Sequence, residues 1–357
     1  MIRRAIPVLL LLALLPIVSA HVGYVLPPED ITANAGGDAL WLMQPLWNPL
    51  YLSLMIGTII VALGVYFLVS RNERFRDWAS GLEAWSGTYT EFLPWIARLG
   101  LGIVLIGAGT GGVLLSPAAP VALFNVIQIL LGFLLLAGLL TGIITWLVLA
   151  LYAYGVFLHP YLLGNLDIAA LCVAILAFGS SRPGIDDLFG LRFFGALSRL
   201  RAYAPTILRV GIGVAFAFLA VYEKLLNPHL SELVVQRYEL MGVIPVTAAM
   251  WVLAAGLIEL AVGVALFVGL RTRLFAAIAF GVLSLSFFYF SEAVYSHITL
   301  FATLSILFVT GGGPLSIDSW LESRAKARRV AMDAALSMPA AKDPVPLKVA
   351  VKAKKKW

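Results

Sequence analysis

Two apolar runs, ILRVGIGVAFAFLAVYEKLLNP at residues 207–228 and WVLAAGLIELAVGVALFVGLRTR at residues 251–273, decide the fold. Each run is long enough for a helix that crosses a bilayer, and a polar loop separates them, so we expect two membrane helices joined outside the membrane. Glu259 lies in the middle of the second run, far from any other charge in that run. Because a carboxylate at bilayer depth is costly, Glu259 is a functional-site hypothesis from the outset.

The composition indicates that the whole chain, and not only these two runs, belongs to a membrane protein. Hydrophobic residues make up 61% of the 357 residues and charged residues only 12%, against about 25% charged in soluble domains. Several apolar runs of membrane-spanning length predict an all-α, polytopic membrane protein. The single cysteine, Cys172, excludes a disulfide within the chain and a thiolate metal cluster. The positive charge is concentrated in loops and at the C-terminal end, which indicates membrane topology and not nucleic-acid binding.

The N-terminal residues 1–20 have the pattern of a secretory signal peptide. Arg3 and Arg4 precede an apolar core, and Val18-Ser19-Ala20 is a small-residue cleavage site. The alternative is an uncleaved anchor. Residues 21–47 then form an external segment and 48–70 a lead transmembrane helix. We expect eight further spans, at residues 94–115, 121–139, 141–158 and 165–179, and at 205–223, 247–269, 273–291 and 295–310.

Residues 94–190 and 204–321 resemble each other. PWIARLGLGIV at 94 matches PTILRVGIGVA at 205, and Gln128 stands where the second copy has Glu259. This self-similarity predicts two copies of one four-helix unit, which run in the same direction. The aligned pairs are Pro94, Arg98, Gly100, Gly102 and Pro117 with Pro205, Arg209, Gly211, Gly213 and Pro228; Gly132, Gly138 and Thr141 with Gly263, Gly269 and Thr272; and Asp186 with Asp318.

The second copy resembles the DoxX/DoxD family of small membrane proteins. The resemblance rests on the LRxGxG opening at residue 208, EKLxxP at 223, GxxELxxGxxLxxG at 256 and LRTR at 270. It implies a four-helix membrane bundle, so the expected fold is a lead helix followed by two tandem DoxX-like bundles. For some members it also implies redox partnership, as in the small subunit of thiosulfate:quinone oxidoreductase.

Basic residues alternate with the spans in a way that predicts orientation. The arginines after the lead helix, those between the two copies, Arg271, Arg273 and the C-terminal segment all fall on one side. By the positive-inside rule this side is cytoplasmic. We therefore expect a multi-pass plasma-membrane protein with an external N-terminus and a basic cytoplasmic tail at 322–357.

The two copies share the aligned residues given above but differ at several other polar positions. The first copy has Gly112 and Val113 in place of Glu223 and Lys224, Gln128 in place of Glu259, and Asn165 in place of His297. We therefore expect the second copy to hold any functional site. Glu259 should point into the bundle, toward Arg209, Tyr289 or His297, with Lys224 at the external end of its helix. It is either a buried group that fixes helix packing or a proton or quinone site.

The remaining candidates have simpler interpretations. Arg98 and Arg209 lie near helix starts and are expected to snorkel to lipid phosphates. Glu223 and Lys224 are expected at the external interface, as a candidate surface for a partner or ligand. A free N-terminal His21 could bind copper through its amine and imidazole, although the spacing offers no second ligand. We expect no other metal site.

The leading functional hypothesis is a redox-associated membrane subunit that exchanges electrons or protons with a quinone. The chain has no recognisable flavin, haem or iron–sulfur signature, so the catalytic cofactors would belong to a partner subunit, and whether the chain is itself an enzyme stays open. The alternative is a non-catalytic membrane scaffold or a small-molecule transporter.

Overall fold

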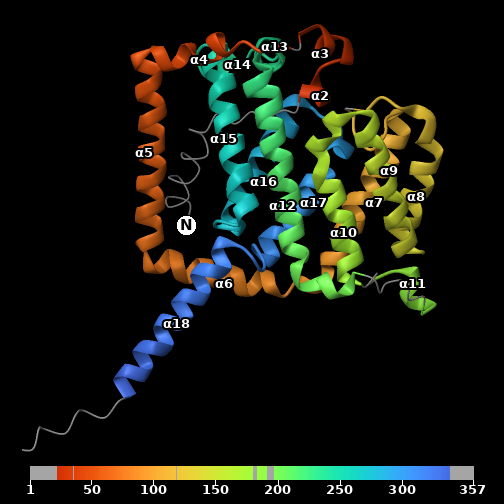
Figure 1. Ribbon diagram of the computed structural model, residues 1–357, viewed down its shortest axis with the longest axis vertical. Helices are drawn as coiled ribbons and strands as arrows, with labels where there is room; N and C mark the ends of the chain where they lie inside the picture. The colour runs from red at the N-terminus through yellow and green to blue at the C-terminus, as the bar shows by residue number, and fades with distance from the viewer. Residues whose placement is uncertain (1–21, 35, 118, 180–182, 191–196, 338–357) are drawn as a thin grey trace, which may run out of the picture. The chain divides into compact units, whose positions relative to one another are not determined.

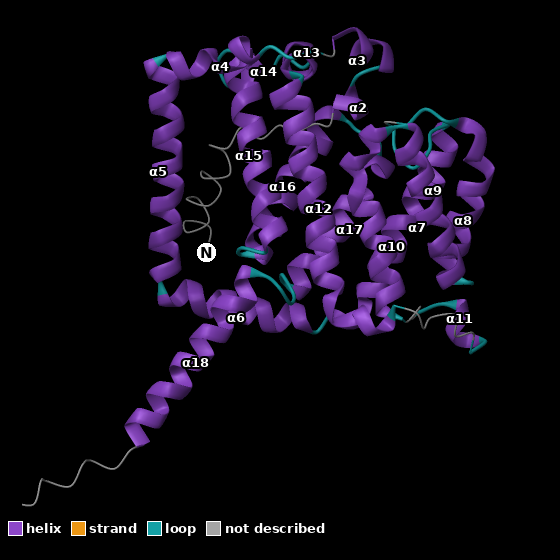
Figure 2. Cartoon of the chain, in the orientation of Figure 1, coloured by secondary structure: helices purple, strands orange, loops and turns teal. Residues whose placement is uncertain are grey.

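The computed structural model describes residues 22–34, 36–117, 119–179, 183–190 and 197–337, and these residues form helices and loops without a strand (Figures 1 and 2). Seven helical segments are long and apolar enough to cross a membrane, and two shorter apolar helices accompany them. The predicted all-α polytopic membrane protein is thereby confirmed. Seven of the nine predicted spans overlap a helix of membrane-spanning length, and the other two, at residues 121–139 and 295–310, overlap the shorter apolar helices. The predicted signal peptide, His21 and residues 338–357 lie outside the described residues.

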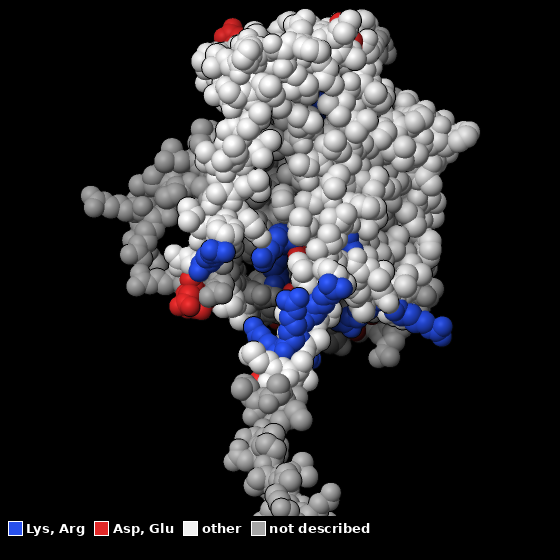
Figure 3. Space-filling model, turned by 60° about the vertical axis from the view of Figure 1, so that its left-hand side comes forward, with Lys and Arg blue, Asp and Glu red and all other residues white. Residues whose placement is uncertain are grey.

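The described chain begins with short helices that lie at one end of the molecule. These are α2 (Val22–Val25), α3 (Pro28–Asn34) and α4 (Ala39–Trp47). The lead span α5 (Pro49–Arg71) crosses to the opposite end, where α6 (Glu73–Gly87) follows it (Figure 1). Figure 3 shows that Lys and Arg side chains gather toward that opposite end, as the charge pattern of the sequence predicts.

Two groups of apolar helices follow. The first group contains α7 (Leu93–Gly111), α8 (Asn125–Ala137), α9 (Thr141–Leu158) and α10 (Leu166–Phe178), and the short helix α11 (Ile185–Leu188) follows it. The second group contains α12 (Ala204–Leu219), α15 (Ala248–Val268), α16 (Thr272–Phe290) and α17 (Val294–Thr310). Between α12 and α15 the chain forms α13 (Pro228–Arg237) and α14 (Leu240–Val243), which have no counterpart in the first group.

The fourth helix of each group packs against the first helix of the other. A Cβ placed on Gly100 of α7 would lie 2.7 Å from the Cβ of Ala302 of α17, and one on Gly211 of α12 would lie 2.4 Å from the Cβ of Ala170 of α10. These glycines therefore let the backbones approach more closely than any larger residue would allow. One continuous hydrophobic core includes residues from both groups, so the two groups form one packed body.

Replacing Gly211 by alanine is expected to destabilise this crossing. The added Cβ would meet Ala170 well inside contact distance, and overpacking of this kind costs about 1–3 kcal/mol. The matched control is Gly281→Ala on α16, where a Cβ would meet nothing within 4 Å. Thermal unfolding in detergent should show a lower transition temperature for Gly211→Ala and no decrease for Gly281→Ala. Equal behaviour of the two variants would argue against the close crossing.

Each group also has an equivalent pair of hydrogen bonds at the end of the molecule where α6 lies. Asp186 accepts hydrogen bonds from the backbone N–H groups of Leu140 (2.7 Å) and Thr141 (2.8 Å). Asp318 accepts the same pair of bonds from Arg271 (2.7 Å) and Thr272 (2.8 Å). Each aspartate thus satisfies N–H groups at the start of the third helix of its group, which have no partner within the helix.

The arginines Arg98 and Arg209 do not snorkel to the surface, and this expectation was wrong. Both side chains are buried. Arg98 donates to the carbonyl of Pro183. Arg209 donates to the carbonyls of Gly312 (2.8 Å) and Leu315 (2.6 Å), and also to that of Phe267. Helix ends and tight turns leave carbonyls without donors, and a guanidinium satisfies several of them at once.

A second unit of the chain begins at Trp320. Its described part is most of α18 (Ile317–Ser337). There, the guanidinium of Arg324 lies 3.9 Å from the ring centroid of Trp320, a favourable cation–π contact.

Candidate functional site

The centre of the candidate site is an ionic cluster of Glu223, Lys224 and Glu259. The Lys224 ammonium lies 2.7 Å from Glu259 Oε2 and 3.2 Å from Glu223 Oε2. The exposed fractions of the three residues are 0%, 2% and 7%. Three ionisable side chains therefore meet with almost no access to water.

A local change of helix geometry places two neighbouring residues in this interior. After Leu219, α12 continues as a π-helical segment, Ala220–Leu226, which contains Glu223 and Lys224. The wider turn of a π-helix changes the direction in which side chains leave the axis, and such segments are common at functional sites. Gly256 of α15 helps, because a Cβ there would lie 3.0 Å from Lys224 Cβ. The lysine stem therefore packs directly against the α15 backbone.

This geometry corrects two expectations. The side chains of Glu223 and Lys224 are buried between helices, so they do not form the exposed surface for a partner or ligand that we expected. Glu259 points inward as expected, but its ionic partner is Lys224 and not Arg209, Tyr289 or His297. Arg209 binds carbonyls of residues 267, 312 and 315, and the exposed Tyr289 donates to the carbonyl of Tyr238.

Groups outside the second group of helices complete the surroundings of Glu223. The Tyr161 hydroxyl, from the first group, donates a hydrogen bond to Glu223 Oε1. The backbone N–H of Val22 donates to the same oxygen at 3.1 Å, and that of Gly23 donates to the Tyr161 hydroxyl at 3.4 Å. The site is therefore shared, which corrects the expectation that it belongs to the second copy alone.

The first group has a neutral version of the same arrangement. Gln128 is fully buried; its Oε1 accepts from the Leu115 N–H at 2.8 Å and its Nε2 donates to the Val113 carbonyl at 2.9 Å. Val113 is the residue that aligns with Lys224. In the first group the Gln128 amide binds the backbone of residues 113 and 115, just after the first helix. In the second group Glu259 binds the side chain of Lys224, at the aligned position.

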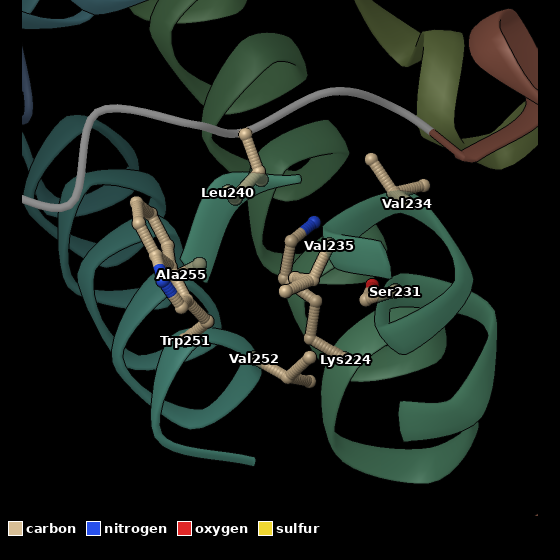
Figure 4. Close-up of a pocket in the computed structure, with 8 residues that line it drawn as sticks. All are labelled: Lys224, Ser231, Val234, Val235, Leu240, Trp251, Val252 and Ala255. Carbon is tan, nitrogen blue, oxygen red and sulfur yellow. The ribbon is translucent and has the colours of Figure 1, made fainter. Parts of the chain in front are cut away.

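A small cavity adjoins the cluster on the side of α13 and α14. Its volume is about 20 Å³, and Figure 4 shows the Lys224 side chain extending between α13 and α15 beside it. A cavity of this size holds about one water molecule. Its lining is mostly apolar and contains Lys224, Ser231, Val234, Val235, Leu240, Trp251, Val252 and Ala255.

A second polar cluster lies where the two groups meet. His297 of α17 is fully buried, with its Nε2 3.5 Å from Glu292 Oε2 and its Nδ1 3.2 Å from the Ser296 hydroxyl. Burial raises the pKa of Glu292, which lies between the spans α16 and α17, to about 7. Tyr24 of α2 packs edge-on against the His297 ring, with centroids 5.3 Å apart, and its hydroxyl accepts from Asn165 Nδ2 at 2.6 Å.

Sequence reasoning missed Tyr24, Tyr161, Asp167 and Glu292 as members of these clusters. Asp167, on α10, is fully buried. It lies in a span, two residues after Asn165, and Asn165 aligns with His297. A carboxylate in a span was the signal that identified Glu259, so the same signal could have identified Asp167. Tyr24 and Tyr161 gave no such signal, because an aromatic residue near the membrane interface is unremarkable in a sequence.

A third ionic group lies at the surface between α4 and α13. His229 Nδ1 lies 2.7 Å from Glu232 Oε2, its Nε2 lies 3.5 Å from Asp38 Oδ2, and its ring packs on Trp41 with centroids 4.9 Å apart. The hydrogen bond to Glu232, with a smaller contribution from Asp38, raises the pKa of His229. The two carboxylates bind opposite ring nitrogens, so they do not converge on one metal ion.

We expect this contact to respond to pH. Because the folded-state pKa of His229 is raised, its stabilisation is fully present below the unfolded-state value, about 6.5, and is lost as the pH rises through the folded-state pKa. Hydrogen exchange of the α4 amides should therefore become faster as the pH rises through that range, after correction for the intrinsic pH dependence of exchange. His229→Gln should abolish this additional dependence. Its persistence in that variant would assign the effect to another group.

Within the described residues, no group of three or more His, Cys, Asp or Glu side chains could hold a metal ion. His21, the candidate copper ligand, lies outside them.

The part of the chain that contains the ionic cluster matches a known protein family. Residues 204–292 match the DoxX family model. The match begins with α12 and extends just past α16, so it includes Arg209, Glu223, Lys224 and Glu259, and it ends before α17. No curated protein and no solved structure matches the chain. Together with the apolar helices, the match identifies an integral membrane protein with a DoxX-like domain.

Proposed function

We propose that this protein is a redox-associated membrane subunit that works with a quinone, and that the Glu223–Lys224–Glu259 cluster takes up and releases a proton during the reaction. The observation that carries the proposal is the charge of the cluster. Two carboxylates and one ammonium leave one negative charge, which is costly in a buried, low-dielectric site. One bound proton removes that charge, so the cluster is suited to hold a single exchangeable proton.

Quinone chemistry moves protons that such a group can take up and release. A quinone accepts two electrons and two protons when it becomes a quinol. The electrons would come from a partner subunit that oxidises a reduced sulfur compound such as thiosulfate, since the chain has no recognisable electron-carrying cofactor signature. The protons must pass through protein groups or water. In this scheme the chain handles the proton and the partner handles the electrons.

We further propose that the two groups of helices arose as tandem copies of one DoxX-like unit. The support is the recurrence of the same contacts at aligned residues: the Asp186 and Asp318 bonds, the Arg98 and Arg209 bonds, and the reciprocal Gly100 and Gly211 crossings. The gathering of basic side chains toward the α6 end supports a plasma-membrane orientation with that end in the cytoplasm. The ionic cluster then lies toward the external side.

Glu259→Gln tests the proposed function. The variant keeps size and hydrogen bonding and copies the residue that the first group has at position 128. Membranes of a deletion strain carrying each variant would be assayed for thiosulfate-dependent reduction of a short-chain quinone analogue. We expect Glu259→Gln to reach wild-type amounts in the membrane and to lose activity by about 100-fold, the scale of a lost proton-transfer group.

Gln128→Ala is the matched control, because it alters the aligned buried position without touching a charge. It should keep its activity per folded molecule. Loss of activity in Gln128→Ala with full activity in Glu259→Gln would overturn the assignment. Full activity in both variants would support the structural alternative, in which the chain is a membrane scaffold and the cluster only fixes helix packing.

A further inference from the structure

The phenol ring of Tyr24 is held by side chains from both groups of helices. Asn165 Nδ2 donates to its hydroxyl at 2.6 Å, and the His297 ring packs edge-on at 5.3 Å between centroids. Asn165 precedes α10 and His297 is in α17, and these two residues align with each other between the two copies. Tyr24 therefore lies at the junction of the groups, between two equivalent positions.

The junction has more polar groups than a tyrosine needs. Asp167, two residues after Asn165, is fully buried, and no cation pairs with it in the described part of the chain. Glu292 and Ser296 lie beside His297. A site built only to hold one phenol ring would be expected to be largely apolar, with a single partner for the hydroxyl. The residues present offer acceptors and donors to a ligand that exchanges protons.

In the described part of the chain, the backbone of the segment that carries Tyr24 has few hydrogen bonds to the two groups of helices. Helix α2 has four residues. Its backbone is anchored by the Val22 N–H bond to Glu223 and the weaker Gly23 N–H bond to Tyr161. Val22 and Leu26 belong, with residues of α13 and α15, to a small hydrophobic cluster that is separate from the main core. Short segments with few buried contacts open locally at low free-energy cost.

We infer that Tyr24 occupies, as a tethered substitute, a binding site for a hydroxylated aromatic ring such as the headgroup of a quinol. Asn165 binds the ring hydroxyl, His297 packs against the ring, and movement of α2 vacates the site. The naming of a quinol as the natural ligand rests on the proposed function, whereas the recognition of a phenolic ring rests on the contacts of Tyr24 alone. The same movement would also break the Val22 bond to Glu223, so ring binding is coupled to the ionic cluster.

Tyr24→Ala tests the ring site directly. The purified variant in lipid nanodiscs would be titrated with 4-methylphenol and, separately, with toluene, which has the same ring without the hydroxyl. We expect binding of 4-methylphenol with about tenfold preference over toluene, the scale of one hydrogen bond. The preference should disappear in Tyr24→Ala/Asn165→Leu. Equal binding of the two probes by Tyr24→Ala would reveal only an apolar hole and would overturn the inference.

Tyr152→Ala provides the matched control. Tyr152 is buried, and its hydroxyl donates to the Leu162 carbonyl at 3.0 Å, so its truncation removes the same side chain away from the junction. It should show no comparable preference for 4-methylphenol. Should Tyr24→Ala fail to fold, Tyr24→Phe replaces it: without its hydroxyl the ring of residue 24 is bound less tightly, so a short-chain hydroquinone should bind to this variant more tightly than to wild type. Unchanged or weaker hydroquinone binding by Tyr24→Phe would count against the site.

The wild-type protein supplies the second measurement. A short-chain hydroquinone should displace Tyr24 and free the Val22 and Gly23 amides, which would then exchange with deuterium at least about tenfold faster. Unchanged exchange at saturating hydroquinone would contradict displacement. These readouts need no thiosulfate and no electron transfer. The ring site can therefore fail while the Glu259→Gln result stands, and the reverse is equally possible.

Discussion

Replacing Lys224 by methionine is expected to destabilise the protein by about 3–5 kcal/mol, the usual cost of removing one partner from a buried ion pair. Lys224 is the only cation paired with Glu223 and Glu259 in the described structure, so its loss leaves two buried carboxylates side by side. Methionine retains most of the stem that packs on α15, which limits the packing loss. Thermal or denaturant unfolding in detergent would measure the effect.

A triple variant, Glu223→Gln/Lys224→Met/Glu259→Gln, separates charge from packing. Replacement of a whole buried ionic group by neutral residues is often neutral or stabilising, so this variant should recover most of the stability that Lys224→Met loses. It should nonetheless lack the proposed proton function. If the triple variant were as unstable as Lys224→Met, packing and not the unbalanced charge would explain the loss.

Arg209→Met is expected to cost at least about 3 kcal/mol. The Arg209 side chain donates to carbonyls of Phe267, Gly312 and Leu315, and each buried carbonyl left without a donor costs about 1–3 kcal/mol. The measurement is again unfolding in detergent.

The control is Arg271→Met, because the Arg271 side chain is exposed. Its change should stay within about 0.5 kcal/mol. A small effect of Arg209→Met in detergent, together with a large effect of changing the lipid headgroup on the wild type, would restore the lipid-phosphate interpretation.

The helices could be predicted from the sequence because hydrophobic length alone determines a membrane span. The inward direction of Glu259 followed from the cost of exposing a carboxylate to lipid. The burial of Lys224 did not follow, because its position near the end of the span does not show which way its side chain points, and the chain there is π-helical. The role of Arg209 was missed because the carbonyls it binds belong to turns far along the chain.

The contribution of the N-terminal segment could not have been predicted from local pattern. Val22 and Tyr24 contact residues 223, 165 and 297, and contacts of such sequence separation leave no periodicity to read. Between the copies, unequal polar content did identify the second as the ionic one. It did not reveal that Tyr161, Asn165 and Asp167 of the first copy border the same region, because an alignment of copies compares positions and does not show which copy's residues meet.

The crossing of α7 with α17 has a consequence for biosynthesis. A membrane protein is made from its N-terminus, so α7 enters the bilayer early, whereas α17, whose Ala302 packs against Gly100, is the last apolar helix of the described chain to be made. The equivalent glycine, Gly211 of α12, packs against α10, which is already in the membrane when α12 is made. The side of α7 that contacts α17 must therefore stay exposed to lipid until α17 has been made. The nascent protein should be most sensitive to quality-control proteases until translation has passed residue 310.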